Sequence, residues 1–335
     1  MNARGRIRVG IVGAGNIASI AQLPTLVKRD DVELAALVTR DPDPAPVMRR
    51  WGFGSSYDTV DAMLAAEKLD AAFVLTPRSA HAEAVEACLR RDVDVYCEKP
   101  LAPAGDEAER LADLADEHGR LLMVDFNRRY APAYVEGREA FGTAGADFCV
   151  AQKNRPGSEY RATFENAIHM VDLLRWYCAG EPVSVTAHAA GDDPWQEDGL
   201  AAVIRFDSGS TGVLTAARTA GAWNEKLDAY GSGRSAEVRA PESVAVTIDG
   251  RTTTRDLSSE AFGWATATET FGFAESVHHF LDRIEDREQP RTSGRDAVAT
   301  QRLLDRILEA AGLPTHEQEG RTWTSHATNT ARTNR

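Results

Sequence analysis

Residues 1–125 alternate short apolar runs with longer amphipathic segments, which is the pattern of a parallel sheet covered by helices. Each apolar run is nearly continuous in Val, Ile, Leu, Ala or Phe, as strands buried on both faces tend to be. Helical periodicity predicts helices between the runs, for example Ser79–Arg90 and Asp106–His118. The predicted strands are Ile7–Val12, Val32–Val38, Ala71–Leu75, Val93–Cys97 and Leu121–Phe126.

After about Asn127 the pattern changes to one helix, Phe164–Tyr177, followed by strands separated by Gly-containing turns. The turns Asp207-Ser-Gly-Ser and Asp249-Gly250 are hairpin signals. Two more helices are predicted at Phe273–Glu285 and at about Arg295–Ala311. The predicted strands are Val183–Ala189, Leu200–Phe206, Thr211–Ala217, Leu227–Gly231, Ala236–Arg239 and Val244–Ile248, which favours a largely antiparallel sheet.

These patterns predict two domains, and the length of 335 residues agrees with that number. The first, residues 1–125, is an α/β domain with a doubly wound parallel sheet. The second, residues 126–314, is an α+β domain with a large, open, mostly antiparallel sheet, whose last helices are expected to return to the first domain. Residues 315–335 are polar and without periodicity, and we expect a mobile tail.

Composition narrows the range of partners. The formal net charge of -13 and the pI near 5.2 argue against nucleic-acid binding, which needs a basic face. No stretch approaches the ~18 apolar residues of a membrane span, and no apolar signal region precedes the first strand. The four cysteines form no C-x-x-C pair. We therefore expect a cytoplasmic protein with a small-molecule partner, and neither a nucleic acid nor a membrane.

A glycine-rich turn follows the first strand: residues 13–18 read G-A-G-N-I-A and open a helix. In the dinucleotide fingerprint Gly13 allows the tight turn, Gly15 lets the backbone approach the pyrophosphate, and Ala18 permits close packing of helix and strand. The helix N-terminus then offers N–H groups to the phosphates. Because a strand precedes the motif and a helix follows it, the sequence predicts a Rossmann dinucleotide-binding domain.

The end of the second strand bears on the choice of cofactor. An acidic residue usually binds the adenosine ribose there, but this chain has Thr39 and Arg40, with Asp41 one position later. A hydroxyl and a guanidinium suit a 2′-phosphate, and the guanidinium can also lie over the adenine. The sequence therefore favours NADP(H) over NAD(H), although a shifted loop would bring Asp41 to the ribose.

A charged pair, Glu98 and Lys99, stands at the carboxyl end of the fourth predicted strand and is followed by Pro100. Open α/β sheets place their ligands at this edge. The proline disfavours the helical conformation at Lys99, and a partly desolvated lysine can shuttle a proton. A surface ion pair beside a turn is the alternative interpretation of these three residues taken alone.

Taken together, five motifs resemble those of the glucose-fructose oxidoreductase/inositol dehydrogenase/MocA (Gfo/Idh/MocA) family over nearly the whole chain. They are the glycine turn, T-P-x-x-x-H at Thr76–His81, E-K-P-L at Glu98–Leu101, N-R-R-Y-A-P at Asn127–Pro132, and E-N-A-I-H-M-V-D at Glu165–Asp172. The segments Phe271–Asp282 and Pro290–Ser293 are similar to the family's C-terminal helix and the turn after it.

The resemblance implies a Rossmann domain joined to an open-faced sheet, with the nicotinamide between them. It implies that Lys99 contacts the reacting oxygen of the substrate and that His169 is the partner acid or base. Helical spacing also puts Glu165, His169 and Asp172 on one face. The family commonly has aspartate where this chain has Glu165, so Glu165 is expected to accept a substrate hydroxyl, to orient His169, or only to pack. Asp172 is expected to be structural.

The full set of predicted site residues follows from these motifs. His81 is expected mainly to steady the nicotinamide loop. Weaker candidates for substrate binding are Asn127, Arg129, Arg155 and Trp195, and no metal site is expected. The predicted cofactor contacts are Gly13, Gly15, Asn16, Ile17, Thr39, Arg40, Thr76, Pro77, His81, Glu98 and Lys99, and the predicted catalytic residues are Lys99, His169 and Glu165.

The leading function is hydride transfer between a nicotinamide and a secondary alcohol or ketone of a sugar, polyol or related small molecule. Two alternatives stay open: a glycosidase that uses its dinucleotide for transient oxidation and elimination, and a dinucleotide-sensing regulator without turnover. By the resemblance, the apolar face of the strand-rich half is expected to form a homodimer or homotetramer.

Overall fold

The computed structural model describes residues 5–157, 161–258 and 267–315. The N-terminal domain contains a six-stranded parallel sheet with the strand order β3-β2-β1-β4-β5-β6, which is the doubly wound Rossmann order. The strands are β1 (Ile7–Val12), β2 (Val32–Val38), β3 (Ser55–Tyr57), β4 (Ala71–Val74), β5 (Asp94–Cys97) and β6 (Leu122–Val124). All five predicted strands are confirmed, and the short edge strand β3 was not predicted.

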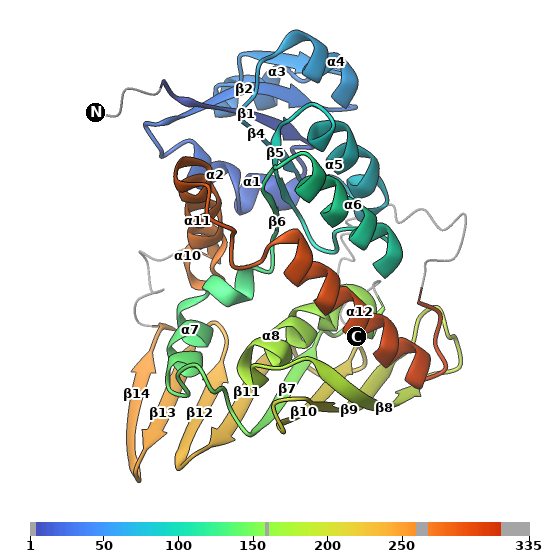
Figure 1. The fold of residues 1–335 in the computed structure, drawn as a ribbon, viewed down its shortest axis with the longest axis vertical. Coiled ribbons are helices and arrows are strands. Elements are labelled where there is room, and N and C mark those ends of the chain that lie inside the picture. Colours follow the sequence, from blue (N-terminus) through green and yellow to red (C-terminus); the bar gives the residue numbers. More distant parts are fainter. Residues whose placement is uncertain (1–4, 158–160, 259–266, 316–335) are drawn as a thin grey trace, which may run out of the picture.

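Helices cover both faces of this sheet (Figure 1). They are α1 (Asn16–Ile20), α2 (Leu23–Leu26), α3 (Ala45–Trp51), α4 (Val60–Ala66), η1 (Arg78–Ala80), α5 (His81–Leu89) and α6 (Gly105–Glu117). Helix α11 (Phe273–Asp286) comes from the end of the chain and packs on the same face as α1 and α2. There the Phe280 ring lies 5.5 Å from Phe73 and 5.6 Å from Tyr96. A late segment therefore completes the first core.

The C-terminal domain holds an eight-stranded sheet with the order β14-β13-β12-β11-β7-β10-β9-β8, antiparallel except where β7 pairs with β10. This confirms the predicted class of the second domain. The strands are β7 (Phe148–Asn154), β8 (Pro182–Ala190), β9 (Gly199–Phe206), β10 (Thr211–Ala217), β11 (Asn224–Gly231), β12 (Arg234–Arg239), β13 (Ser243–Ile248) and β14 (Arg251–Asp256). The sequence prediction missed β7 and β14.

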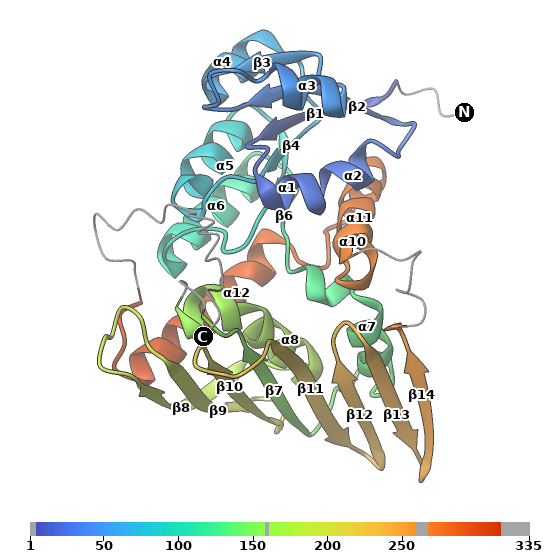
Figure 2. The same cartoon turned by 180° about the vertical axis from the view of Figure 1, so that it is seen from behind.

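One face of this sheet is covered by helices and lies toward the Rossmann domain (Figures 1 and 2). The remaining helices are η2 (Asn127–Tyr130), α7 (Pro132–Glu139), a π-helical turn η3 (Ala162–Ala167), α8 (Ile168–Cys178), α10 (Ala267–Thr270) and α12 (Gly294–Ala310). Burial alternates along β9 and β10, so every second side chain lies on the opposite, less buried face. Asp249 and Gly250 both have positive φ, at 51° and 77°, which confirms the predicted hairpin turn.

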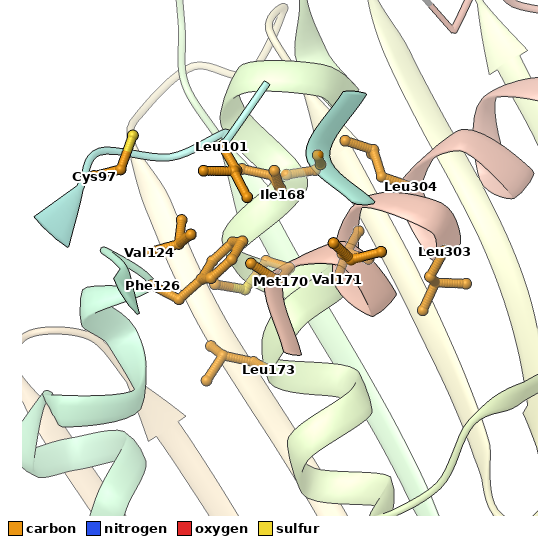
Figure 3. Close-up of a cluster of buried hydrophobic side chains, with 14 of the residues drawn as sticks. Cys97, Leu101, Val124, Phe126, Ile168, Met170, Val171, Leu173, Leu303 and Leu304 are labelled. Atoms are coloured by element: carbon orange, nitrogen blue, oxygen red, sulfur yellow. The ribbon is translucent and has the colours of Figure 1, made fainter. Parts of the chain in front are cut away.

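The two domains share one apolar core at their junction (Figure 3). Val124 and Phe126 come from the end of β6, Leu101 from the loop after β5, and Ile168 and Val171 from α8. All of them are buried, and Leu303 and Leu304 of α12 lie beside them. Because close-packed cores resist deformation, this junction fixes the orientation of the site residues on α8 relative to the Rossmann strands. The exact domain limits at residues 125 and 314 stay predictions.

Candidate active site

The glycine turn after β1 has the geometry that a dinucleotide phosphate requires. Gly13 has φ +89°, and a Cβ there would come within 3.1 Å of Thr76 Cγ2 and 3.2 Å of Leu75 O. A Cβ at Gly15 would meet nothing within 4 Å. Gly15, Asn16 and Ile17 are exposed, and Ile17 is 49 % accessible although it is apolar. The turn is thus tight on its protein side and open on its outer side, which fits a bound pyrophosphate.

The loops after β4 and β5 are held together by His81. Its Nδ1 lies 2.7 Å from the carbonyl oxygen of Pro100, and its Nε2 lies 2.8 Å from that of Thr76. The ring is buried, and its desolvation lowers its pKa against the opposing effect of the two carbonyls. These contacts support the predicted loop-steadying role. Beside it, Thr76 Oγ1 is buried with no partner among the described residues, and Pro77 is exposed.

Glu98 and Lys99 lie just beyond β5, as predicted, but Glu98 belongs to a network that the sequence did not reveal. Gln22 Nε2 donates to Glu98 Oε1 at 2.9 Å and to Asp125 Oδ2 at 3.0 Å. Glu98 Oε2 in turn accepts the backbone N–H of Lys99 at 3.2 Å. Burial, followed by the charge of Asp125, raises the pKa of Glu98 to about 7. The backbone N–H of Lys99 is therefore bound to Glu98, which Gln22 links to a second carboxyl group, Asp125.

His169 approaches this region from the other domain, in the first turn of α8. It is buried, its ring lies 6.5 Å from that of Phe126, and its Nδ1 has no partner within the described parts of the chain. Desolvation, followed by the charges of Lys153, Arg128 and Lys99, holds its pKa well below the ordinary value. His169 is therefore neutral near pH 7, and the charge of Lys99 contributes to that state.

A second lysine lies beside His169. Lys153 is at the buried end of β7, and its Nζ lies 2.9 Å from Glu225 Oε2. Arg128 binds the same carboxylate through two hydrogen bonds of 2.7 and 3.0 Å. Sequence reasoning missed this cluster because it missed β7. The sequence did contain a signal for it: residues alternate along β7, and this alternation puts Lys153 on the same buried face as Cys149 and Ala151.

Of the weaker substrate-binding candidates, Asn127 and Arg129 are engaged in contacts within the protein. Asn127 Nδ2 donates to Phe271 O at 2.9 Å. Arg129 makes two hydrogen bonds to Asp172, of 2.8 and 2.7 Å, and an ion pair with Asp296. Buried carboxylate and carbonyl partners therefore hold these two side chains, and their role in substrate binding stays a prediction.

Arg155 and Trp195 lie in loops at one end of the C-terminal sheet: Arg155 follows β7, and Trp195 stands between β8 and β9. Glu197, two residues after Trp195, accepts hydrogen bonds from Arg161 Nε and from the backbone N–H of Thr163, both at 3.0 Å. The loop of Trp195 therefore reaches the start of the π-helical turn.

Glu165 lies in this π-helical turn, so the α-helical spacing used to align it with His169 does not apply to it. Its side chain lies outside the described residues. π-Helical turns occur often at functional sites.

These features define a two-domain oxidoreductase that binds a nicotinamide dinucleotide. Residues 7–126 match the family model "Oxidoreductase family, NAD-binding Rossmann fold", and residues 150–237 match the GFO/IDH/MocA C-terminal domain. The putative oxidoreductase YceM of Salmonella typhimurium is 30% identical over 91% of this chain and 98% of its own length. The chain belongs to the Gfo/Idh/MocA family of oxidoreductases.

Two further similarities agree with this assignment. Inositol 2-dehydrogenase of Rhizobium meliloti is 26% identical over 91% of this chain and 96% of its own length. The solved structure of UDP-N-acetylglucosamine 3-dehydrogenase GnnA from Acidithiobacillus ferrooxidans superimposes with a TM-score of 0.80 at 21% identity, covering 92% of this chain and 98% of that one. Among the described residues, no helix has the length and apolarity needed to cross a membrane.

Proposed function

We propose that the protein transfers a hydride between NADP(H) and a secondary alcohol or ketone of a sugar, polyol or related small molecule. The core that the two domains share carries this proposal, because it contains both Leu101, two residues after Lys99, and Ile168, one residue before His169. The nicotinamide supplies the hydride chemistry. The relatives named as inositol and sugar-nucleotide dehydrogenases support the choice of a CH–OH substrate.

Each of the two residues has a defined task in this reaction. The ammonium of Lys99 stabilises the negative charge that develops on the substrate oxygen. His169 is neutral because of its lowered pKa, so it can accept the hydroxyl proton during oxidation and return it during reduction. Glu165 stays the predicted third member of this set.

The glycine turn and the loops after β2, β4 and β5 would hold the dinucleotide. Gly13, Gly15, Asn16 and Ile17 are the proposed phosphate contacts, and Thr76, Pro77 and Glu98 lie where the nicotinamide end would reach. Arg40 is exposed at the end of β2. Asp41 Oδ1 accepts the backbone N–H of Asp43 at 3.0 Å, which holds it within its own loop. This arrangement favours a 2′-phosphate contact with Thr39 and Arg40, and so NADP(H).

The test is absorbance of the reduced nicotinamide with a panel of sugars and polyols. Wild type is expected to turn over at least one of them. Lys99→Ala should lower kcat by about 10²- to 10⁴-fold while NADPH binding, followed by fluorescence, persists. Lys68→Ala, at an exposed lysine, is the matched control and should change neither quantity.

Three outcomes would contradict the proposal. The first is full activity of Lys99→Ala. The second is cleavage of glycosides without net change in the cofactor, which indicates the glycosidase. The third is no turnover combined with a cofactor-dependent protein partner, which indicates the sensor.

The same proposal places the protein in the cytoplasm as a homodimer or homotetramer formed through the C-terminal sheet. The less buried face of that sheet carries exposed apolar side chains, including Phe148, Val203 and Tyr230. Isolated monomers do not commonly leave such a face uncovered. Light scattering coupled to size exclusion should give two or four chains, and a monomer at micromolar concentration contradicts the assembly.

A further inference from the structure

The Lys153 side chain is enclosed at the same end of the C-terminal domain as His169. Along β7, Cys149, Ala151 and Lys153 share the face that α8 and the π-helical turn cover, and Lys153 is 5 % exposed. A lysine with so little exposure normally requires a partner that compensates its charge. Its partner is Glu225, directly opposite on the neighbouring strand β11.

Glu225 does not compensate Lys153 alone. Its two oxygens also accept both hydrogen bonds of Arg128 and one from the Tyr134 hydroxyl at 3.1 Å. The cluster therefore holds two cationic side chains against one carboxylate, and all three are buried. Burial lowers the pKa of Lys153 to about 7, and an anion that joins the cluster would stabilise the charged form of Lys153.

The groups around this charge are short of acceptors. His169 Nδ1 and Asn166 Nδ2 are buried and have no hydrogen-bond partner among the residues that the structure describes. Asn166 stands three residues before His169, and its Nδ2 can only donate. Both Lys153 and Lys99 act on the charge state of His169. A negatively charged ligand with several hydrogen-bond acceptors would satisfy the Asn166 amide. It would also compensate the cationic side chains that share Glu225.

We propose that Lys153 is a specificity residue that binds an anionic group of the substrate, so that the site prefers an acidic sugar derivative to the neutral sugar. The proposal rests on the proposed function, since it concerns the substrate of the same site. The anionic group is a carboxylate or a phosphate, which present the same charged oxygens to an ammonium. Glu225 and Arg128 hold the Lys153 ammonium in position.

The experiment compares three ligands that share one ring: D-glucose, D-glucuronate and D-glucose 6-phosphate. Binding to the NADP⁺-loaded protein is measured by calorimetry, and turnover is measured in parallel. Wild type should bind at least one of the two anionic ligands roughly 10- to 100-fold more tightly than glucose, the contribution of a charge-assisted hydrogen bond. The stronger of the two identifies the anionic group.

Three variants separate specificity from folding. Lys153→Met keeps the length and apolar stem, and Glu225 keeps Arg128 and Tyr134 as partners, so the fold should persist in circular dichroism. Its preference for the anionic ligand should vanish, while glucose binding changes by less than about threefold. Lys153→Arg keeps the charge and should retain the preference. Lys226→Met, one residue after Glu225 and on the opposite face of β11, should behave as wild type.

Equal or weaker binding of both anionic ligands by wild type overturns the proposal, and so does an unchanged preference in Lys153→Met. Turnover of neutral sugars alone overturns it too, while leaving the proposed function standing. Binding that follows the expected pattern without any turnover supports the specificity role and contradicts the proposed hydride transfer.

Discussion

The two domains bury clusters of charged side chains of different composition. In the Rossmann domain, Glu98 and Asp125 are both carboxyl groups, and the amide of Gln22 bridges them at 2.9 and 3.0 Å. In the C-terminal domain, Glu225 is one carboxylate shared by Lys153 and Arg128. The first cluster accumulates negative charge, and the second accumulates positive charge.

Each arrangement has its own response to burial. Two neighbouring carboxyl groups can release their charge by keeping a proton, and burial raises the pKa of both Glu98 and Asp125. The mixed cluster stays ionised at its centre, because Arg128 and Lys153 outweigh desolvation and hold the pKa of Glu225 far below its ordinary value. Lys153 adapts instead: desolvation lowers its pKa to about 7. Burial therefore shifts the pKa of acidic groups in the Rossmann domain and the pKa of a basic group, Lys153, in the C-terminal domain.

The largest expected effect comes from removing the centre of the mixed cluster. Glu225→Gln keeps the shape of the side chain but leaves Lys153 and Arg128 without a counter-charge. Breaking a buried ion pair from one side costs about 3–5 kcal/mol, and we expect a loss of that order in the free energy of unfolding, measured in urea. Glu237→Gln, at an exposed carboxylate on β12, is the control and should change stability by less than about 0.5 kcal/mol. Similar losses in the two variants would show that the cluster is not buried in solution.

The next largest effect concerns Glu98 and Asp125, and it is a dependence of the protein's stability on pH. The pKa of Glu98 is about 7 in the folded protein and 4.5 as an ordinary glutamate, so the folded state binds more protons between these values. Stability of wild type should therefore fall as pH rises through this window, by about 1–3 kcal/mol. Asp125→Asn removes the neighbouring charge and should flatten that slope, so the variant should gain stability relative to wild type above pH 7.

Melting temperatures of both proteins from pH 5 to 8 check this prediction. Asp70→Asn is a suitable control, because Asp70 is an exposed carboxylate at the other end of the sheet, before β4. An Asp125→Asn curve parallel to that of wild type would mean that the two carboxyl groups do not interact.

Most of the fold could be predicted from local sequence, and the Rossmann part of the candidate site was proposed on the same ground. The run before Gly13 and the step from β5 into Glu98 and Lys99 are contiguous, and parallel strands bring their carboxyl ends to one edge. His169 could be proposed because its motif is also contiguous. In each case neighbouring residues in the chain carry both the element and its chemistry.

The clusters could not be predicted because they join distant segments. Lys153 and Glu225 are paired by the register of β7 with β11, and Gln22, just before α2, meets Asp125, just after β6, across about a hundred residues of chain. Side-chain alternation indicates which face a residue takes, but not which strand lies next to it. The partners of Arg129 could not be predicted for the same reason, because Asp172, which accepts its two hydrogen bonds, lies on the separate helix α8.

The smallest expected effect concerns cofactor binding by Arg40, a single exposed side chain that belongs to neither cluster. Arg40 follows β2 and is exposed, so its removal should not disturb the fold. Arg40→Ala should weaken NADPH binding by about tenfold, as expected for one solvent-exposed charge-assisted contact, and leave NADH binding unchanged. Fluorescence titration with both cofactors measures this, and Arg49→Ala, at an exposed arginine on α3, is the control. If NADH binds wild type more tightly than NADPH, the preference for the 2′-phosphate is wrong, and Asp41 must leave its contact with Asp43 to reach the ribose.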